Sequence, residues 1–154
     1  MIRALYLLPL LALLGKPVLA AEEALTVYKS PTCGCCIVWI SHLEEYGFTA
    51  TVNHPDDFNS VKKKLGITSR TASCHTAVSE QGYVFEGHVP ARYIEAFLAK
   101  PPTNAIGLSV PAMPVGSPGM EAGDRFQPYD VLQLNDDGST SIYASVKTLQ
   151  QQYE

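Results

Sequence analysis

Three of the four cysteines lie within residues 33–36 (Cys-Gly-Cys-Cys), and the fourth, Cys74, directly precedes His75. Sulfur at this density is typical of redox chemistry or of a site for a soft metal ion. Two structural disulfides are an alternative, but adjacent side chains on a helix point about 100° apart, so bridges from both Cys35 and Cys36 would be strained. The pattern therefore predicts a metal site whose ligands are Cys33, Cys35, Cys36 and Cys74.

The chemistry of the ligands indicates which metal to expect. Four thiolates at close range need cations to offset their charge. Zinc could take four cysteines in one tetrahedron, but the adjacent Cys35 and Cys36 fit a single tetrahedron poorly. Several thiophilic ions that share sulfurs suit them better, and thiolates with thioethers nearby favour Cu(I). Copper is therefore the expected metal, with zinc as the weaker alternative.

Two histidines and two methionines are further candidate ligands, because imidazole accepts either copper valence and the thioether is a soft donor. Each has a plainer alternative. The histidines could be polar residues at the rim of a sheet, and the methionines could fill gaps under a loop. The candidates are His75, His88, Met113 and Met120.

The elements that must position these residues are predicted from hydrophobic periodicity and turn residues. They follow the order βαβαββα, which is that of a thioredoxin-like α/β domain, and a Pro/Gly/Met-rich loop (107–123) and a β-hairpin form a C-terminal extension from about residue 101. The loop with Cys74 should then face the start of the first helix. The predicted strands are 24–28, 48–53, 76–79, 83–85, 129–134 and 141–146, and the predicted helices are 33–46, 56–65 and 91–100.

A different function also fits part of the pattern. Cys33 and Cys36 have the C-x-x-C spacing of a dithiol redox site at a helix N-terminus, where free N–H groups lower a thiol pKa. This favours a thioredoxin-like thiol–disulfide oxidoreductase. Against it, Cys35 adds a third sulfur that could scramble a disulfide, and residues 73–75 (Ser-Cys-His) stand where such enzymes usually have a cis-proline. We therefore expect no classical enzyme.

The first 20 residues have the features of a secretory signal peptide, with a positive start, an apolar run over 4–14 and small residues before the expected cleavage. A membrane anchor is the alternative, but the run is short for a span of about 20 residues. The mature domain is then 21–154, exported and without a membrane segment. Without Arg3 and Lys16 its basic residues number 11 − 2 = 9 against 15 acidic ones, so there is no electrostatic case for binding nucleic acid.

Four segments also carry a resemblance to a known family. They are 28–36 (Tyr-Lys-Ser-Pro-Thr-Cys-Gly-Cys-Cys), 73–77 (Ser-Cys-His-Thr-Ala), 86–91 (Glu-Gly-His-Val-Pro-Ala) and 111–121 (Pro-Ala-Met-Pro-Val-Gly-Ser-Pro-Gly-Met-Glu). In sequence and in order they resemble the CopG family of bacterial copper-resistance proteins, over roughly residues 25–143.

The resemblance implies a periplasmic, thioredoxin-like protein that holds a multinuclear copper cluster, with redox interconversion of the copper. By position, its cluster cysteines correspond to Cys33, Cys35, Cys36 and Cys74. Copper ions are the expected partners, together with other copper-efflux or chaperone proteins. A copper chaperone that hands ions to a membrane pump or oxidase is a third hypothesis.

Some polar residues are expected to have no special role. His42 is assigned to the outer face of the first helix, and His54, next to Pro55, is assigned to solvent. The run 62–64 (Lys-Lys-Lys) is interpreted as a solvated helix face. Trp39 is expected in the core.

Overall fold

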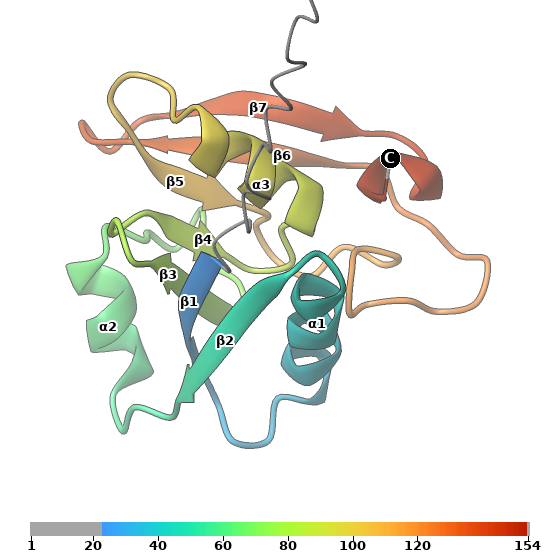
Figure 1. The fold of residues 1–154 in the computed structure, drawn as a ribbon, viewed down its shortest axis with the longest axis horizontal. Coiled ribbons are helices and arrows are strands. Elements are labelled where there is room, and N and C mark those ends of the chain that lie inside the picture. Colours follow the sequence, from blue (N-terminus) through green and yellow to red (C-terminus); the bar gives the residue numbers. More distant parts are fainter. Residues whose placement is uncertain (1–22, 154) are drawn as a thin grey trace, which may run out of the picture.

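The computed structural model describes residues 23–153, which form a single seven-stranded sheet with three α-helices and a short 3₁₀ helix (Figure 1). Within these residues no helix is long and apolar enough to cross a membrane. The expected signal peptide lies outside them. The strands are β1 (Glu23–Lys29), β2 (Phe48–Asn53), β3 (His75–Ser79), β4 (Val84–Glu86), β5 (Ala105–Ser109), β6 (Tyr129–Asn135) and β7 (Thr140–Val146); the helices are α1 (Gly34–Glu45), α2 (Phe58–Lys64), α3 (Ala91–Ala99) and η1 (Leu149–Gln152).

The sheet is mixed, with strand order β2-β1-β3-β4-β5-β6-β7. β1 is parallel to β2 and β4 to β5, and the other neighbours are antiparallel. α1 makes the crossover between the parallel pair β1 and β2, as such a connection requires. The antiparallel pairing of β1 with β3 places Lys29 opposite His75. The end of β1, the start of β3 and the end of β4 therefore lie side by side, where these inner strands reach the same end of the sheet.

Two hydrophobic clusters cover the two faces of the sheet. Successive residues of a strand point to opposite faces, so Phe85 packs in one cluster and Val84 in the other. The larger cluster contains Trp39 of α1 and Phe97 of α3, both fully buried, so α1 and α3 share its face. The smaller one includes Leu65, at the end of α2, on the opposite face.

The predicted α/β class and the order βαβαββα are observed over residues 23–99, as is the C-terminal hairpin, formed by β6 and β7. One strand differs from the prediction: Ala105–Ser109 forms β5, where the sequence pattern predicts irregular structure. β5 pairs with β4 on one side and with β6 on the other. β5 thereby joins the C-terminal hairpin to the same sheet as the first four strands.

His42 is not a solvated residue, contrary to our expectation. It is only 7% exposed, and its Nε2 accepts a hydrogen bond from the N–H of Ala91, at the start of α3, at 3.1 Å. The ring also packs against Tyr46 and Tyr153. Burial lowers the pKa of His42 below its usual value of 6.5, although Glu45 and Glu121 act in the opposite direction.

We expect the metal-free protein to lose stability as the pH falls below about 6.5. Below about pH 6.5 the histidines of the unfolded chain bind protons, whereas the buried histidines of the folded protein stay neutral. The free energy of unfolding is therefore highest above this pH and falls as the pH is lowered. Urea unfolding at pH 7.5 and 5.5 would measure the difference. A His42→Gln variant keeps an acceptor for Ala91 and should show a smaller drop; an unchanged drop would contradict the assignment. His75 and His88, whose pKa values are also lowered by burial, should supply the remainder.

Candidate metal centre

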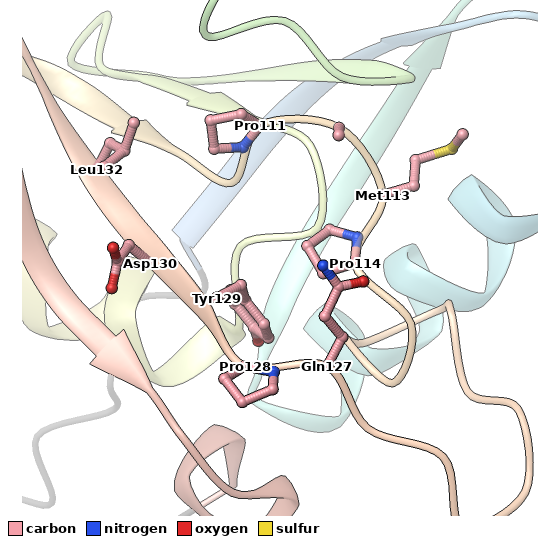
Figure 2. A pocket seen from close by; sticks show the side chains of 9 residues that line it. Pro111, Met113, Pro114, Gln127, Pro128, Tyr129, Asp130 and Leu132 are labelled. Atoms are coloured by element: carbon pink, nitrogen blue, oxygen red, sulfur yellow. The ribbon is translucent and has the colours of Figure 1, made fainter.

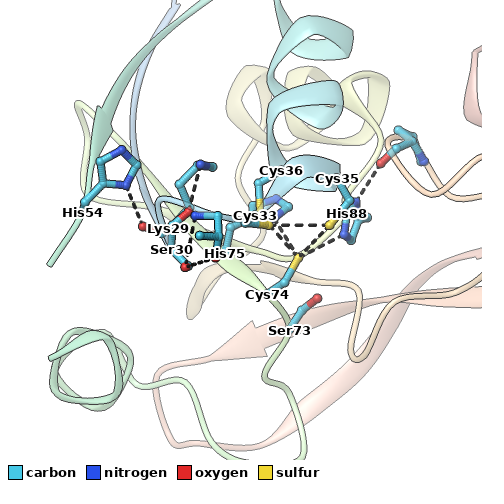
Figure 3. Close-up of a disulfide and its surroundings, with 12 residues drawn as sticks. Lys29, Ser30, Cys33, Cys35, Cys36, His54, Ser73, Cys74, His75 and His88 are labelled. Atoms are coloured by element: carbon cyan, nitrogen blue, oxygen red, sulfur yellow. Dashed lines mark hydrogen bonds between the residues drawn. A yellow bond between two sulfur atoms is a disulfide. The ribbon is translucent and has the colours of Figure 1, made fainter. Parts of the chain in front are cut away.

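The four cysteines come together at the end of the sheet where the end of β1, the start of β3 and the end of β4 lie side by side (Figure 3). After β1 the chain turns through residues 30–33, and Cys33 becomes the N-cap of α1. Cys74 lies one residue before β3, just beyond the last residue pair between β1 and β3. The local structure of two segments about forty residues apart thus brings their sulfurs to the same place.

The sulfur atoms are close enough to bind the same ion or ions. Cys74 Sγ is 3.7 Å from Cys36 Sγ and 4.0 Å from Cys35 Sγ, and Cys33 Sγ is 3.5 Å from Cys35 Sγ. All four lie within 4.8 Å of one another. Cys36 is fully buried and the other three are half-buried. The site is therefore a compact group of sulfurs that opens to solvent on one side.

A disulfide joins Cys33 to Cys36, whereas Cys35 and Cys74 are free thiols. The alternative of two structural bridges among the four cysteines is thus not what the fold contains. The bridged pair is the C-x-x-C pair of a dithiol redox site. In this form it offers no thiolate to a metal, and its reduction would restore both sulfurs as ligands.

Cys74 has an unusual electrostatic environment. Burial, together with the neighbouring thiol of Cys35, raises the pKa of Cys74 to about 12. Without a metal ion the group is therefore a neutral thiol at pH 7. A thiophilic cation would favour its thiolate form, because it supplies the positive charge that this part of the site lacks.

Two imidazole rings complete the surroundings of Cys74. His88 Nε2 is 3.1 Å and His75 Nδ1 is 3.2 Å from Cys74 Sγ, and both rings are fully buried. His88 Nδ1 is 2.8 Å from the carbonyl of Pro118, to which it donates, so that Nε2 faces the sulfur with a lone pair. Metal-binding histidines usually have this kind of partner on the second nitrogen. His75 Nε2 is buried without a hydrogen-bond partner among the described residues, and the ring packs 4.2 Å from Trp39.

The predicted methionine-bearing loop passes over the start of α1. A Cβ on Gly119 would lie 2.6 Å from the carbonyl oxygen of Cys35, so only glycine permits this approach, and its φ is +87°. Gln152 of η1, fully buried, donates to the carbonyl of Gly116 at 2.9 Å and fixes the loop from the other side. Met120 is half-buried in this loop, whereas Met113 is 49% exposed at its outer end.

A Gly119→Ala change should lift this loop from α1. The new methyl group would collide with the backbone of Cys35, so the hydrogen bond from His88 to Pro118 should weaken and the His88 ring should lose its fixed orientation. We expect roughly a tenfold loss of metal affinity, the lower end of the effect of removing an outer-shell partner. Gly123→Ala is the matched control, because Gly123 also has a positive φ but nothing lies within 4 Å of its Cβ position. A competition titration would measure both affinities. Equal metal affinities of the Gly119→Ala and Gly123→Ala variants would show that the close approach of the loop to α1 does not contribute to metal binding.

A buried ion pair between Lys62 and Glu86 holds the segment that contains Cys74. Lys62 of α2 pairs with Glu86 of β4 and donates to Thr76 at 3.0 Å. Glu86, fully buried, accepts from Thr76 at 2.5 Å and from the N–H of Ser73 at 2.6 Å. The interpretation of Lys62 as solvated is therefore wrong. Lys62 comes four residues after Phe58, so the two side chains share one face of α2, and this spacing could have indicated that Lys62 is buried. In the structure, Lys62 Nζ lies 4.3 Å from the centre of the Phe58 ring.

His54 and the cavity beside Met113 lie outside the two groups of potential metal ligands among the described residues. His54 is exposed and bonds to the carbonyl of Lys29 at 2.9 Å, as expected of a solvated residue. A cavity of about 390 Å³ lies between the start of the loop and β6 (Figure 2). Met113 is among the residues that line it, but no cysteine or histidine does. The cavity is therefore not part of the candidate metal centre.

Comparisons with known proteins give one family model and two similar solved structures. A family model described as "Protein of unknown function, DUF411" matches residues 71–120, which contain Cys74, His75, His88 and most of the loop. The comparison with curated proteins gives no match. Two solved structures match at 42% identity: "Copper resistance protein copG- Form 2" (82% of this chain, 99% of that chain, TM-score 0.77) and "Copper resistance protein copG- Form 1" (81%, 98%, 0.76). With that identity over nearly the whole length of both structures, this chain belongs to the CopG family of copper resistance proteins.

Proposed function

We propose that the protein binds copper as its cargo in copper resistance, and that it holds Cu(I) through the thiolates of the four cysteines. The observation that carries the proposal is the grouping of four sulfurs within 4.8 Å of one another. Soft thiolate donors suit Cu(I), although they also suit zinc. The relatives named for copper resistance support the same choice of metal.

The same geometry favours more than one copper ion. Cys35 and Cys36 are neighbours on α1, so their sulfurs diverge, yet each is within 4.0 Å of Cys74 Sγ. Sulfurs in this arrangement can bridge ions, and each added Cu(I) offsets the charge of a thiolate. One tetrahedral zinc ion would make poorer use of the adjacent pair.

The other predicted ligands divide into an inner and an outer group. His88, with its Nε2 aimed at Cys74 Sγ, is the best placed, and His75 approaches the same sulfur from the other side. Met120 lies in the loop that covers the site and would serve as a thioether ligand when the loop is closed. Met113 is exposed, so it would meet copper only at the surface.

Fold and location complete the proposal. The arrangement β2-β1-β3-β4 with α1 and α3 on one face and α2 on the other supports a thioredoxin-like domain. The features of residues 1–20 support export to the periplasm, where copper-efflux or chaperone proteins would be the partners. Interconversion of copper valence is part of the proposed role.

Anaerobic titration with Cu(I) tests the proposal. Fully reduced protein should retain more than one Cu(I) per chain against a competing chelator. X-ray absorption should then report sulfur ligands and a short metal–metal distance. Less than one copper per chain, with full zinc occupancy from a mixture of both metals, would overturn it.

A second candidate function is favoured by one observation, the disulfide between Cys33 and Cys36. A thiol–disulfide oxidoreductase would use this pair on protein substrates. Insulin reduction by a Cys35→Ser variant separates the two functions. An oxidoreductase should keep or gain turnover when the third sulfur is removed, whereas a copper protein should show no turnover and bind less metal.

A further inference from the structure

The pairing between β5 and β6 is incomplete at the start of β6. β5 ends at Ser109, which lies opposite Leu132, so residues 129–131 pair with β7 alone. Successive residues of a strand direct their N–H and C=O groups to alternate sides, so this stretch also has backbone groups on the β5 side. No backbone hydrogen bond joins these groups to another described residue on that side. The start of β6 is therefore an unpaired strand edge within the sheet.

The cavity of about 390 Å³ lies along this edge (Figure 2). Its opposite wall is the segment 111–114, in which Pro111 and Pro114 have no N–H group. The segment is therefore a poor strand partner for β6, and the space between them stays open. Most of the residues that line the cavity are apolar, and Asp130 adds an exposed carboxylate.

We propose that this cavity docks an extended peptide segment of a partner protein, which adds a short strand to residues 129–131. Such an addition satisfies the free backbone groups of a strand edge, and a neighbouring cavity takes alternate side chains of the peptide. Among the described residues Asp130 is the only charged residue that lines the cavity. The Ser145 hydroxyl donates to its Oδ1 at 2.6 Å, which leaves Oδ2 for a cation. The segment that fits is therefore apolar and extended, with one lysine or arginine.

The wall of the cavity is also connected to the metal centre. Ala112 donates its N–H to the carbonyl of Ala72 at 3.1 Å, and its own carbonyl accepts from the Ser73 hydroxyl. These are the two residues before Cys74. Ala112 has a φ of +58°, a conformation that a residue other than glycine keeps only when its surroundings hold it. A docked peptide that draws on this wall would weaken its hold on the Cys74 segment, and this part of the inference rests on the proposed copper function.

A library of random short peptides displayed on phage is the first probe, with the full protein as target. We expect the bound sequences to share apolar residues at alternate positions and one basic residue. A selected peptide should slow amide hydrogen exchange in residues 129–131. Methylation of its backbone nitrogens should abolish binding at one alternating set of positions only, because one side of an added strand faces β6. A library without enrichment, or protection of other segments instead, would overturn the inference.

Two charge reversals sharpen the test. Asp130→Lys should weaken a selected peptide with one lysine about fivefold, and glutamate in place of that lysine should restore binding. Asp136→Lys changes the net charge equally but lies about 20 Å further along the strand, beyond the screening length, so it should have less than about a twofold effect. Equal effects of both would indicate non-specific attraction and contradict the docking site. Self-association that Asp130→Lys abolishes would assign the edge to a second copy of this chain instead.

Titration with Cu(I) in the presence of the peptide tests the link to the metal centre. We expect the affinity for Cu(I) to fall about fivefold, and the affinity for the peptide to fall by the same factor when Cu(I) is bound. Ser73→Ala removes the hydroxyl that holds Ala112, so it should reduce this coupling while the peptide still binds. Failure to retain Cu(I) without peptide contradicts the proposed function. Normal Cu(I) binding that a docked peptide leaves unchanged contradicts only the link.

Discussion

A Cys74→Ser variant is expected to lose at least about 100-fold in affinity for Cu(I), the largest effect of any single change in the site. Even the loss of an outer-shell partner of a metal typically costs 10–100-fold, and Cys74 is a direct ligand candidate. Its sulfur lies within 4.0 Å of two other sulfurs and next to both buried histidines. Among the described residues, Cys74 alone belongs to both groups of potential ligands. Competition titration under anaerobic conditions would measure the affinity.

The comparison that makes this result specific is His88→Gln. It removes one of the two imidazoles beside Cys74 but leaves all four sulfurs in place, so we expect a smaller loss of affinity, roughly tenfold. Thermal unfolding of the metal-free Cys74→Ser protein should remain close to that of the parent, because serine can keep a hydrogen bond to an imidazole. If Cys74→Ser binds the same number of copper ions with the same affinity, the sulfur of residue 74 is not a ligand.

Lys62→Met should cause the largest loss of stability, about 3–5 kcal/mol, because it leaves the buried carboxylate of Glu86 without its cation. The remaining hydrogen bonds from Thr76 and from the N–H of Ser73 do not supply a charge. Urea unfolding would measure the change. Lys63→Met is the matched control: Lys63 is the exposed neighbour on the same helix, and its replacement should shift stability by less than about 0.5 kcal/mol.

The double variant Lys62→Met/Glu86→Gln tests the cause. Neutral glutamine removes the unpaired charge, so the double variant should be more stable than Lys62→Met alone, with a coupling between the two sites. If the Lys62 and Lys63 variants are equally stable, the pair is not buried in solution. Copper affinity should fall together with stability, because Glu86 holds the N–H of Ser73, the residue before Cys74.

Much of the architecture was predictable because its signals are local. Gly47 and Gly66 lie two residues after the ends of α1 and α2, and their φ angles of +81° and +78° are the conformation in which glycine terminates a helix. The apolar stripe of α1, which includes Trp39 and Leu43, is buried as its spacing predicts. The approach of Cys74 to the other three cysteines followed from the predicted order of strands.

What could not be predicted depends on contacts between distant segments. Lys62 and Glu86 are 24 residues apart, and each resembles a solvated charge until α2 packs on the sheet. His42 is buried because α3 begins beside it. The segment Ala105–Ser109 has few strand signals of its own and becomes β5 because β4 and β6 both offer it hydrogen bonds. Such pairings override local propensity.

The hold of Gln152 on the loop has a consequence for proteolysis. Gln152 also accepts a hydrogen bond from Tyr129 at 2.5 Å, so η1 is fastened to β6 as well as to Gly116. The segment that leads into it, Lys147 and Thr148, is exposed. A single tryptic cleavage after Lys147 would leave every cysteine in its place but weaken the attachment of the loop 107–123, which passes over the start of α1. Nicked molecules would then exchange copper faster than intact ones of identical ligand content.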